Sequence, residues 1–115
     1  MLYKDLTSEY SGEPSEKIRT RVQSARNRQV ERFKKSQIFS NGQMATQHIR
    51  KFCKLPSDAQ GILDMAMERL GLSARAYTRI LKVSRTIADL EDSDEIQSRH
   101  VSEAIQYRTL DRDTF

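Results

Sequence analysis

The stretch ERLGLSARAYTRILKVSRTIADL, residues 68–90, decides the fold, because one helix ends and another begins within it. Gly71 can adopt the left-handed backbone conformation that closes a helix, and Ser73 can accept a hydrogen bond from a free N–H group at the start of the next. Apolar or small residues then recur at helical spacing, at Tyr77, Ile80, Leu81, Ser84, Ile87 and Ala88. This pattern predicts a long amphipathic helix directly after a tight break.

Capping residues, turn residues and apolar spacing predict four further helices. Pro14 suits the first turn of a helix, and Thr46 and Ser98 can each cap a helix start. Asn41-Gly42 predicts a turn in the loop before Thr46. The expected helices cover about residues 15–35, 46–54, 57–70, 74–90 and 98–107. Strand-like alternation is nearly absent, so the predicted fold class is all-α, a small bundle of about five helices.

The composition is that of a small protein with a modest core and a well-solvated surface. Its 115 residues are 37% hydrophobic and 31% charged. No apolar run is long enough to cross a membrane, and the first residues lack a signal-peptide pattern. Cys53 is the one cysteine, so no internal disulfide can form. We therefore expect a cytoplasmic protein in which Cys53 is a buried structural thiol.

Positive charge is concentrated in the first predicted helix. The formal net charge of the chain is +4, whereas its last part, from Asp89 onward, is balanced or acidic. Between Glu16 and Lys35, two acidic residues face eight basic ones: Lys17, Arg19, Arg21, Arg26, Arg28, Arg32, Lys34 and Lys35. This asymmetry predicts that the first helix meets phosphate groups or an acidic protein surface.

Residues suited to catalysis are few. His48 and His100 lie far apart, without cysteine or carboxylate partners at metal-ligand spacing, so we expect both to be solvated rather than metal-bound. Asp64, Glu68 and Asp89 are expected on helix surfaces, paired with nearby arginines. A GxxxxGK[ST] phosphate loop is absent from the sequence. The chain by itself is therefore not expected to be an enzyme or to hold a metal.

Arginines gather around the helix break, at Arg69, Arg75, Arg79 and Arg85. A guanidinium group binds phosphate oxygens in pairs, and a helix N-terminus favours anions. Arg75 and Arg79 lie one turn apart, away from the apolar stripe, and so predict a surface that faces phosphate. The alternative is that these arginines form surface ion pairs, which contribute little to stability.

The run GLSARAYTRILKVSRTIADL, the acidic turn after it and the pattern I-x-S-x-H-V-x-E-A-I-Q-Y-R resemble the C-terminal part of magnesium-chelatase-like AAA+ ATPases. Within that family the sequence is most similar to the competence protein ComM (YifB) subfamily. The earlier stretch GEPSEKIRTRVQSARNRQVERF resembles the helix that joins the ATPase core to the lid in that subfamily. Together these segments cover the chain from about Gly12 to Arg112, and the long run is the specific part.

The resemblance implies a role for the arginines. Arg75 matches the sensor 2 arginine of the lid, which would contact the γ-phosphate of ATP, and Arg79 would make a second contact or an interdomain ion pair. The resemblance also implies a parent protein with ATP and Mg bound in an upstream core, a hexameric assembly and remodelling of DNA in recombination or transformation. Four basic residues would face the core, a neighbouring subunit or nucleic acid: Arg19, Arg21, Arg26 and Arg28.

The Walker A, Walker B and arginine-finger segments of such ATPases are absent from this sequence. We therefore interpret residues 1–14 as a linker from an upstream ATPase core, residues 15–110 as the helical lid and residues 111–115 as a tail. Within the family, a metal-chelatase motor subunit is a second interpretation. Outside it, the alternatives are a free-standing basic helical module that binds nucleic acid and a bundle for protein–protein interaction.

Overall fold

In the computed structural model, residues 15–114 are described, with side chains as far as Tyr107. They form a short 3-10 turn at Asn41–Gln43 and five α-helices: α2 (Ser15–Arg32), α3 (Thr46–Phe52), α4 (Ser57–Leu70), α5 (Ala74–Leu90) and α6 (Ser98–Thr114). Within these residues there is no strand, and the predicted all-α bundle of five helices is confirmed. The linker predicted for residues 1–14 lies outside the described part of the chain.

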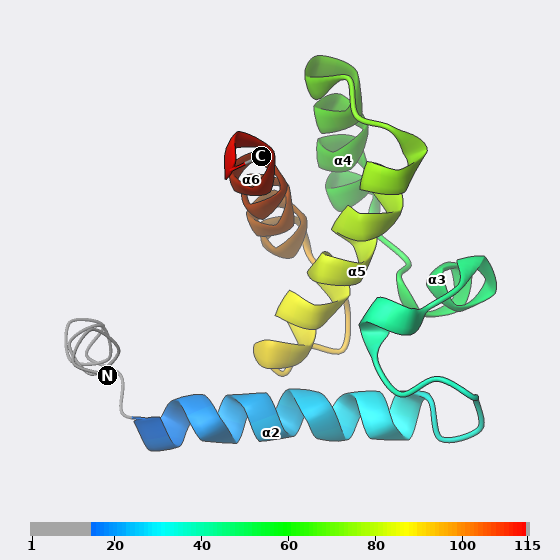
Figure 1. Ribbon diagram of the computed structural model, residues 1–115, viewed down its shortest axis with the longest axis vertical. Coiled ribbons are helices and arrows are strands. Elements are labelled where there is room, and N and C mark those ends of the chain that lie inside the picture. The colour runs from blue at the N-terminus through cyan, green and yellow to red at the C-terminus, as the bar shows by residue number, and fades with distance from the viewer. Residues whose placement is uncertain (1–14, 115) are drawn as a thin grey trace.

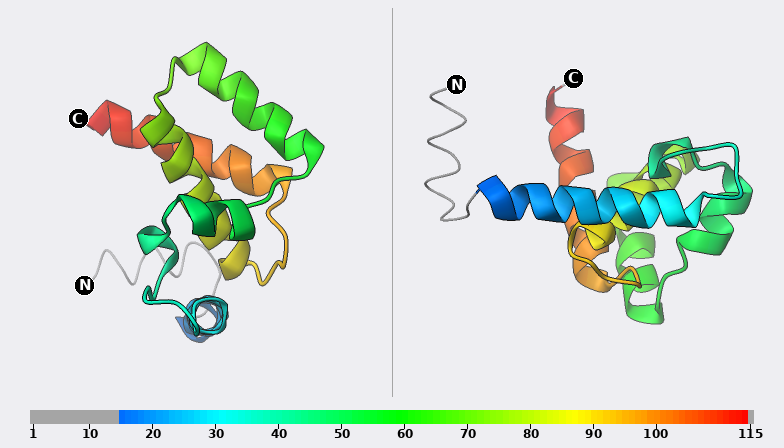
Figure 2. Two further views of the ribbon diagram at one scale, coloured as in Figure 1. Left: turned by 90° about the vertical axis from the view of Figure 1, so that its right-hand side faces the viewer. Right: turned by 90° about the horizontal axis from the view of Figure 1, so that it is seen from below.

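Helix α5 is the central element. It contacts α2, α3 and α6, while α4 packs against α6 (Figure 1). Helix α2 runs across the base of the bundle, roughly at right angles to the others in the two further views (Figure 2). The core forms between α5 and its neighbours from Phe33, Met44, Cys53, Ala59, Leu63, Ile80, Leu81, Ile87, Ala88, Ile96, Val101 and Ala104. Cys53 is buried, as expected from its apolar surroundings.

The break between α4 and α5 has the predicted local structure. Gly71 closes α4 with a left-handed backbone, at φ 60° and ψ 43°. The Ser73 hydroxyl accepts a hydrogen bond from the Ala76 N–H at 3.2 Å and so caps α5. The apolar stripe also faces inward as predicted, with Ile80 and Ala88 fully buried and Tyr77 half-buried.

Replacement of Gly71 by alanine should destabilise the protein through the backbone alone. A Cβ atom at this position would meet no atom within 4 Å, so the cost is that of holding an L-residue at φ +60°. We expect Gly71→Ala to lower the free energy of unfolding by about 1–2 kcal/mol, measured by urea denaturation. Gly61→Ala is the matched control, because a Cβ there also meets open space, but in a helix interior. The control should be stabilised by up to about 1 kcal/mol, and equal effects of both changes would contradict this account.

Three helix boundaries differ from the sequence prediction. Helix α2 ends at Arg32 and α3 at Phe52, two or three residues earlier than expected. Helix α3 begins at Thr46, within the expected range, but its N-cap is Ala45 and not Thr46. Helix α6 continues to Thr114, beyond the polar stretch at which a short last helix was expected to end. Polar composition does not predict where a terminal helix ends, because an exposed helix can consist largely of polar residues. Helix ends are also the least certain part of any helix assignment.

Candidate functional site

The first turn of α5 carries the residue that the sequence singles out. Arg75 is exposed, and it forms no hydrogen bond or ion pair with any residue in the described part of the chain. The Ser73 cap fixes the start of the helix, so the position of Arg75 on the bundle is well defined even though its side chain extends into solvent. Arg75 can therefore bind an anion on another domain or molecule without first breaking a hydrogen bond or ion pair of its own.

Arg79 and Arg69 are also exposed. Arg79 follows Arg75 by one turn on the same side of α5, as the spacing predicts. Arg69 lines a separate apolar hollow between α4 and α6, with Ile62, Met65 and others. The structure therefore keeps Arg75 and Arg79 together on one side of α5, whereas Arg69 belongs to the hollow between α4 and α6.

The prediction of surface positions for Arg85 and Asp89 is wrong. The Asp89 side chain is 0% exposed and that of Arg85 is 5% exposed. Arg32 of α2 donates two hydrogen bonds to the Asp89 carboxylate, at 2.8 and 2.7 Å, and the Asn41 amide donates a third at 2.9 Å. The Arg85 guanidinium lies 3.1 Å from the same carboxylate and donates to the carbonyl oxygens of residues 93 and 94. This buried ion cluster, Arg32–Asn41–Arg85–Asp89, joins α2 to the end of α5.

Burial weakens the hold of Arg85 on its proton within the buried ion cluster. It lowers the pKa of the Arg85 guanidinium below its usual value, and the Asp89 carboxylate partly opposes this shift. Arg85 Nε is buried without a hydrogen-bond partner among the described residues. An unpaired buried donor costs free energy. The contacts of Arg85 with Asp89 and with the backbone carbonyls therefore have to offset the cost of burying its charge.

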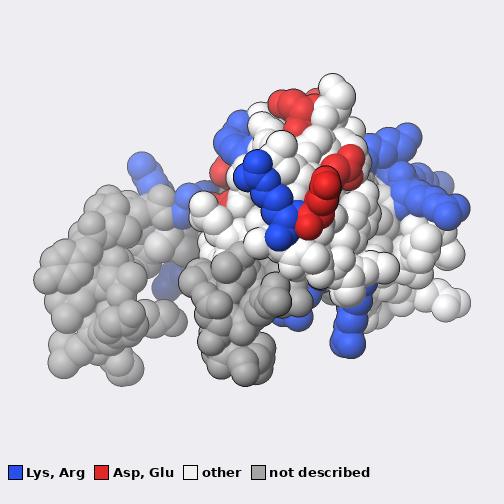
Figure 3. All heavy atoms as spheres, turned by 90° about the horizontal axis from the view of Figure 1, so that it is seen from above, with Lys and Arg blue, Asp and Glu red and all other residues white. Residues whose placement is uncertain are grey.

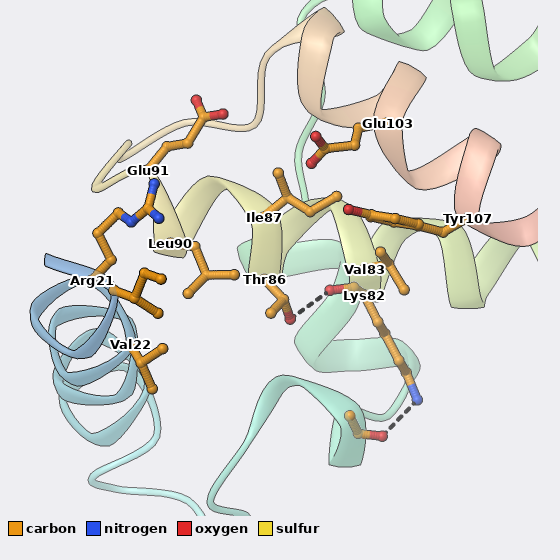
Figure 4. A pocket seen from close by; sticks show the side chains of 12 residues that line it. Arg21, Val22, Lys82, Val83, Thr86, Ile87, Leu90, Glu91, Glu103 and Tyr107 are labelled. Atoms are coloured by element: carbon orange, nitrogen blue, oxygen red, sulfur yellow. Dashed lines mark hydrogen bonds between the residues drawn. The ribbon is translucent and has the colours of Figure 1, made fainter. Parts of the chain in front are cut away.

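The basic residues of α2 do not form one uniform surface. Arg28 is engaged with the acidic turn, donating to Asp92 and Asp94 at 2.9 Å each, and these bonds raise its pKa. Arg19 and Arg26 are exposed and have no ion-pair partner in the described residues. Arg21 points toward Glu91 across a groove (Figure 4). Of the four basic residues predicted to share one role, two therefore lie against the bundle's own acidic residues.

The groove beside Arg21 is a hollow of about 600 Å³ between α2, α5 and α6. Its walls are largely apolar, with Val83 and Ile87 on α5 and Tyr107 on α6 (Figure 4). At one end Lys82 donates a hydrogen bond to the Gly42 carbonyl at 3.0 Å. The polar lining includes Thr86, whose hydroxyl donates a hydrogen bond to the Lys82 carbonyl at 3.1 Å, and the two carboxylates of Glu91 and Glu103.

Both histidines support helix starts, and the prediction that His100 is solvated is wrong, whereas His48 is half-buried. The ring Nδ1 atom of His48 accepts a hydrogen bond from the Ala45 N–H at 3.0 Å, and that of His100 accepts one from the Gln97 N–H at 2.9 Å. Each histidine thus satisfies a backbone donor three residues earlier. His100 is 0% exposed, and its Nε2 atom lies 2.9 Å from Glu91. Because the Nδ1 atom of His100 accepts a hydrogen bond, its Nε2 atom carries the ring proton and donates a hydrogen bond to the Glu91 carboxylate.

Stability should depend on the ionisation of Glu91. The hydrogen bond from His100, with help from Arg99, holds the pKa of the Glu91 carboxyl below its usual value of 4.5. A depressed carboxyl pKa stabilises the fold above the unfolded value, and this contribution is lost as the pH falls through the folded pKa. We expect urea denaturation to show wild type more stable than Glu91→Gln at neutral pH, with the difference declining as the pH falls below 4.5 and vanishing below the folded pKa of Glu91. Glu68→Gln, at an exposed helix position, is the control, and a loss of stability equal to that of Glu91→Gln at neutral pH would contradict this account.

The other predicted surface acids remain on the surface. Asp64 and Glu68 are exposed, and Asp64 accepts a hydrogen bond from the Gln60 amide at 2.8 Å rather than from an arginine. The described residues contain no group of three or more His, Cys, Asp and Glu side chains arranged to hold a metal ion. Within the same residues, no helix combines the length and apolar character needed to span a membrane.

Known proteins are similar to this chain over nearly its whole length. The family described as magnesium chelatase, subunit ChlI C-terminal, matches residues 12–108. The chain is 45% identical over 101 residues to protein YifB of Escherichia coli (strain K12), and 43% identical to the competence protein ComM of Haemophilus influenzae. Each alignment covers 88% of this chain but 19% of the relative, so the chain spans about a fifth of the length of these curated relatives. No solved structure matches the chain. The resemblance found in the sequence is thereby confirmed, and the chain belongs to the magnesium chelatase subunit ChlI C-terminal family, with ComM-like relatives.

Proposed function

We propose that this domain is the lid of an AAA+ ATPase and that Arg75 contacts the γ-phosphate of ATP held, with Mg, by an upstream core of the same chain. The observation that carries the proposal is the exposed Arg75 without a partner in the described residues, on a capped helix start. A planar guanidinium in this position can stabilise charge on a transferring phosphoryl group. The length of the relatives, of which this chain covers 19%, leaves room for such a core.

Helix α5 supplies a path from the nucleotide to the rest of the lid. Arg75 lies in its first turn and Asp89 near its end, about 21 Å apart at 1.5 Å per residue. Asp89 is bonded to Arg32 of α2, so α5 and α2 should move as one rigid body when Arg75 gains or loses its contact with phosphate. Hydrolysis would in this way be converted into rotation of the lid.

We further propose that the parent protein is a hexamer and that it remodels DNA. This part rests on the resemblance to the ComM subfamily and on the competence protein among the relatives. A free-standing nucleic-acid module based on α2 has less support, because Arg28 and Arg32 are engaged in ion pairs with the bundle itself.

The test of the lid function is ATP turnover by the whole parent protein. Arg75→Ala should strongly reduce turnover while the folding of the domain is unchanged, because the side chain is exposed and forms no hydrogen bond or ion pair in the described structure. Unchanged turnover would refute the role proposed for Arg75.

A further inference from the structure

Another concave site lies between α3 and the first half of α5. This α3–α5 hollow has a volume of about 330 Å³. Its lining residues are Thr46, Ile49, Arg50, Cys53, Lys54, Leu55, Gln60, Tyr77, Thr78 and Leu81. It is separate from the groove beside α2, with which it shares no residue.

The charged residues of the α3–α5 hollow are all positive. Arg50 and Lys54 line it, and no aspartate or glutamate does. Both side chains belong to exposed residues and form no ion pair or hydrogen bond with the described part of the chain. In contrast, Arg28 and Arg32 of α2 are held by carboxylates of the bundle. Two unneutralised cations at one hollow favour an anionic ligand.

The remaining polar groups of the hollow are compatible with an anion. Thr46 and Thr78 contribute hydroxyl groups, which can donate hydrogen bonds to phosphate oxygens. Burial raises the pKa of the Cys53 thiol to about 11, so it stays neutral at physiological pH and adds no negative charge to the wall. Asp64 accepts a hydrogen bond from Gln60 of the hollow's wall at 2.8 Å but does not itself line the hollow.

The positive charge extends beyond the hollow itself. Arg75 precedes Thr78 by one helical turn and is likewise exposed without a partner in the described residues. Figure 3 shows lysine and arginine side chains gathered at the side of the molecule on which α3 lies in Figure 1. An open, extended basic surface of this kind fits a polyanion with repeated charges better than a single small ion.

We propose that the α3–α5 hollow binds a phosphate group of a nucleic-acid backbone, with Arg50 and Lys54 as the contacting cations. The choice of nucleic acid as the ligand rests on the proposed function, which names DNA as the substrate. The proposal places the DNA-contacting surface of the lid on α3 and α5, whereas the sequence had pointed to the basic residues of α2. Phosphate contacts of this type carry no base preference, so binding depends on salt more than on sequence.

The test is binding of a fluorescein-labelled DNA duplex to the 115-residue chain, followed by anisotropy over a range of salt concentrations and without ATP. The Arg50→Ala/Lys54→Ala double variant should bind about tenfold more weakly at low salt, and its salt slope should fall by about 2. The matched control is Arg19→Ala/Arg26→Ala, which removes the same charge from exposed, unpaired positions on α2. We expect the control to lose less than about threefold in affinity. Circular dichroism establishes that each variant is folded.

Four outcomes would overturn the proposal. They are the absence of salt-dependent DNA binding, equal losses in the two double variants, displacement of DNA by millimolar MgATP, and competition by poly-glutamate as strong as that by unlabelled DNA. The third would indicate a nucleotide site and the fourth an acidic protein partner. Because the assay contains no ATP turnover, its failure is distinguishable from failure of the role proposed for Arg75.

Discussion

We expect Asp89→Ala to lower the free energy of unfolding by about 3–5 kcal/mol, the largest loss from any single substitution considered. The Asp89 carboxylate is fully buried and is bonded to Arg32 and Arg85, whose side chains are 10% and 5% exposed. Its removal would leave two guanidinium groups without their counter-charge, and water has little access to replace it. Arg85 would suffer most, because its Nε atom already has no partner among the described residues.

Urea denaturation measures this loss, with Glu31→Ala as the control. Glu31 forms an exposed ion pair with Lys34, in which the side chains are 71% and 56% exposed. Such a surface pair contributes at most about 1 kcal/mol. A loss for Asp89→Ala no larger than that of the control would show that the buried ion cluster does not hold α2 to the bundle. The same result would contradict the proposal that α5 and α2 move as one rigid body, on which the proposed rotation of the lid depends.

Arg75→Ala in the whole parent protein should reduce the kcat of ATP hydrolysis by about 100- to 1,000-fold. This is the range found when one preorganised donor to a transition-state anion is removed. Stability should be unaffected, because Arg75 is exposed and forms no hydrogen bond or ion pair in the described structure. The measurement is steady-state phosphate release at saturating MgATP, together with thermal denaturation of the same samples.

Two controls separate the proposed contact from a general effect of charge. Arg75→Lys keeps the positive charge but removes the planar fork, so it should recover only part of the turnover. Arg19→Ala removes an equally exposed arginine from α2 and should leave turnover close to that of wild type. Equal losses for Arg19→Ala and Arg75→Ala would contradict a specific role for Arg75.

The local structure of the chain could be read from its sequence. Gly71 ends α4 with a left-handed backbone and Ser73 caps α5, both as predicted. The apolar stripe of α5 faces the core at the predicted positions. These features depend on interactions within about one helical turn, which is why residue type and spacing were sufficient. The family was also evident from a long contiguous run, and the match over residues 12–108 confirms it.

The burial and the ion-pair partners of the charged residues could not be predicted from residue type and spacing. Asp89 was assigned to the surface and His100 to solvent, yet each is 0% exposed. Periodicity places Asp89 at the edge of the α5 stripe, but it carries no information about an arginine on another helix. Arg50 and Lys54 gave no signal at all, since two basic residues on a short helix are ordinary in sequence.

The sequence by itself therefore determined the five helices, the Ser73 cap of α5, the break at Gly71 and the family to which the chain belongs. Only the tertiary structure decided which cations are neutralised. Arg32 is paired with Asp89, 57 positions away, whereas Arg75 and the two cations of the α3–α5 hollow have no partner in the described residues. The physical reason is one of range. Capping and helical periodicity act between neighbours along the chain, whereas ion pairing and desolvation depend on which surfaces the folded chain brings together.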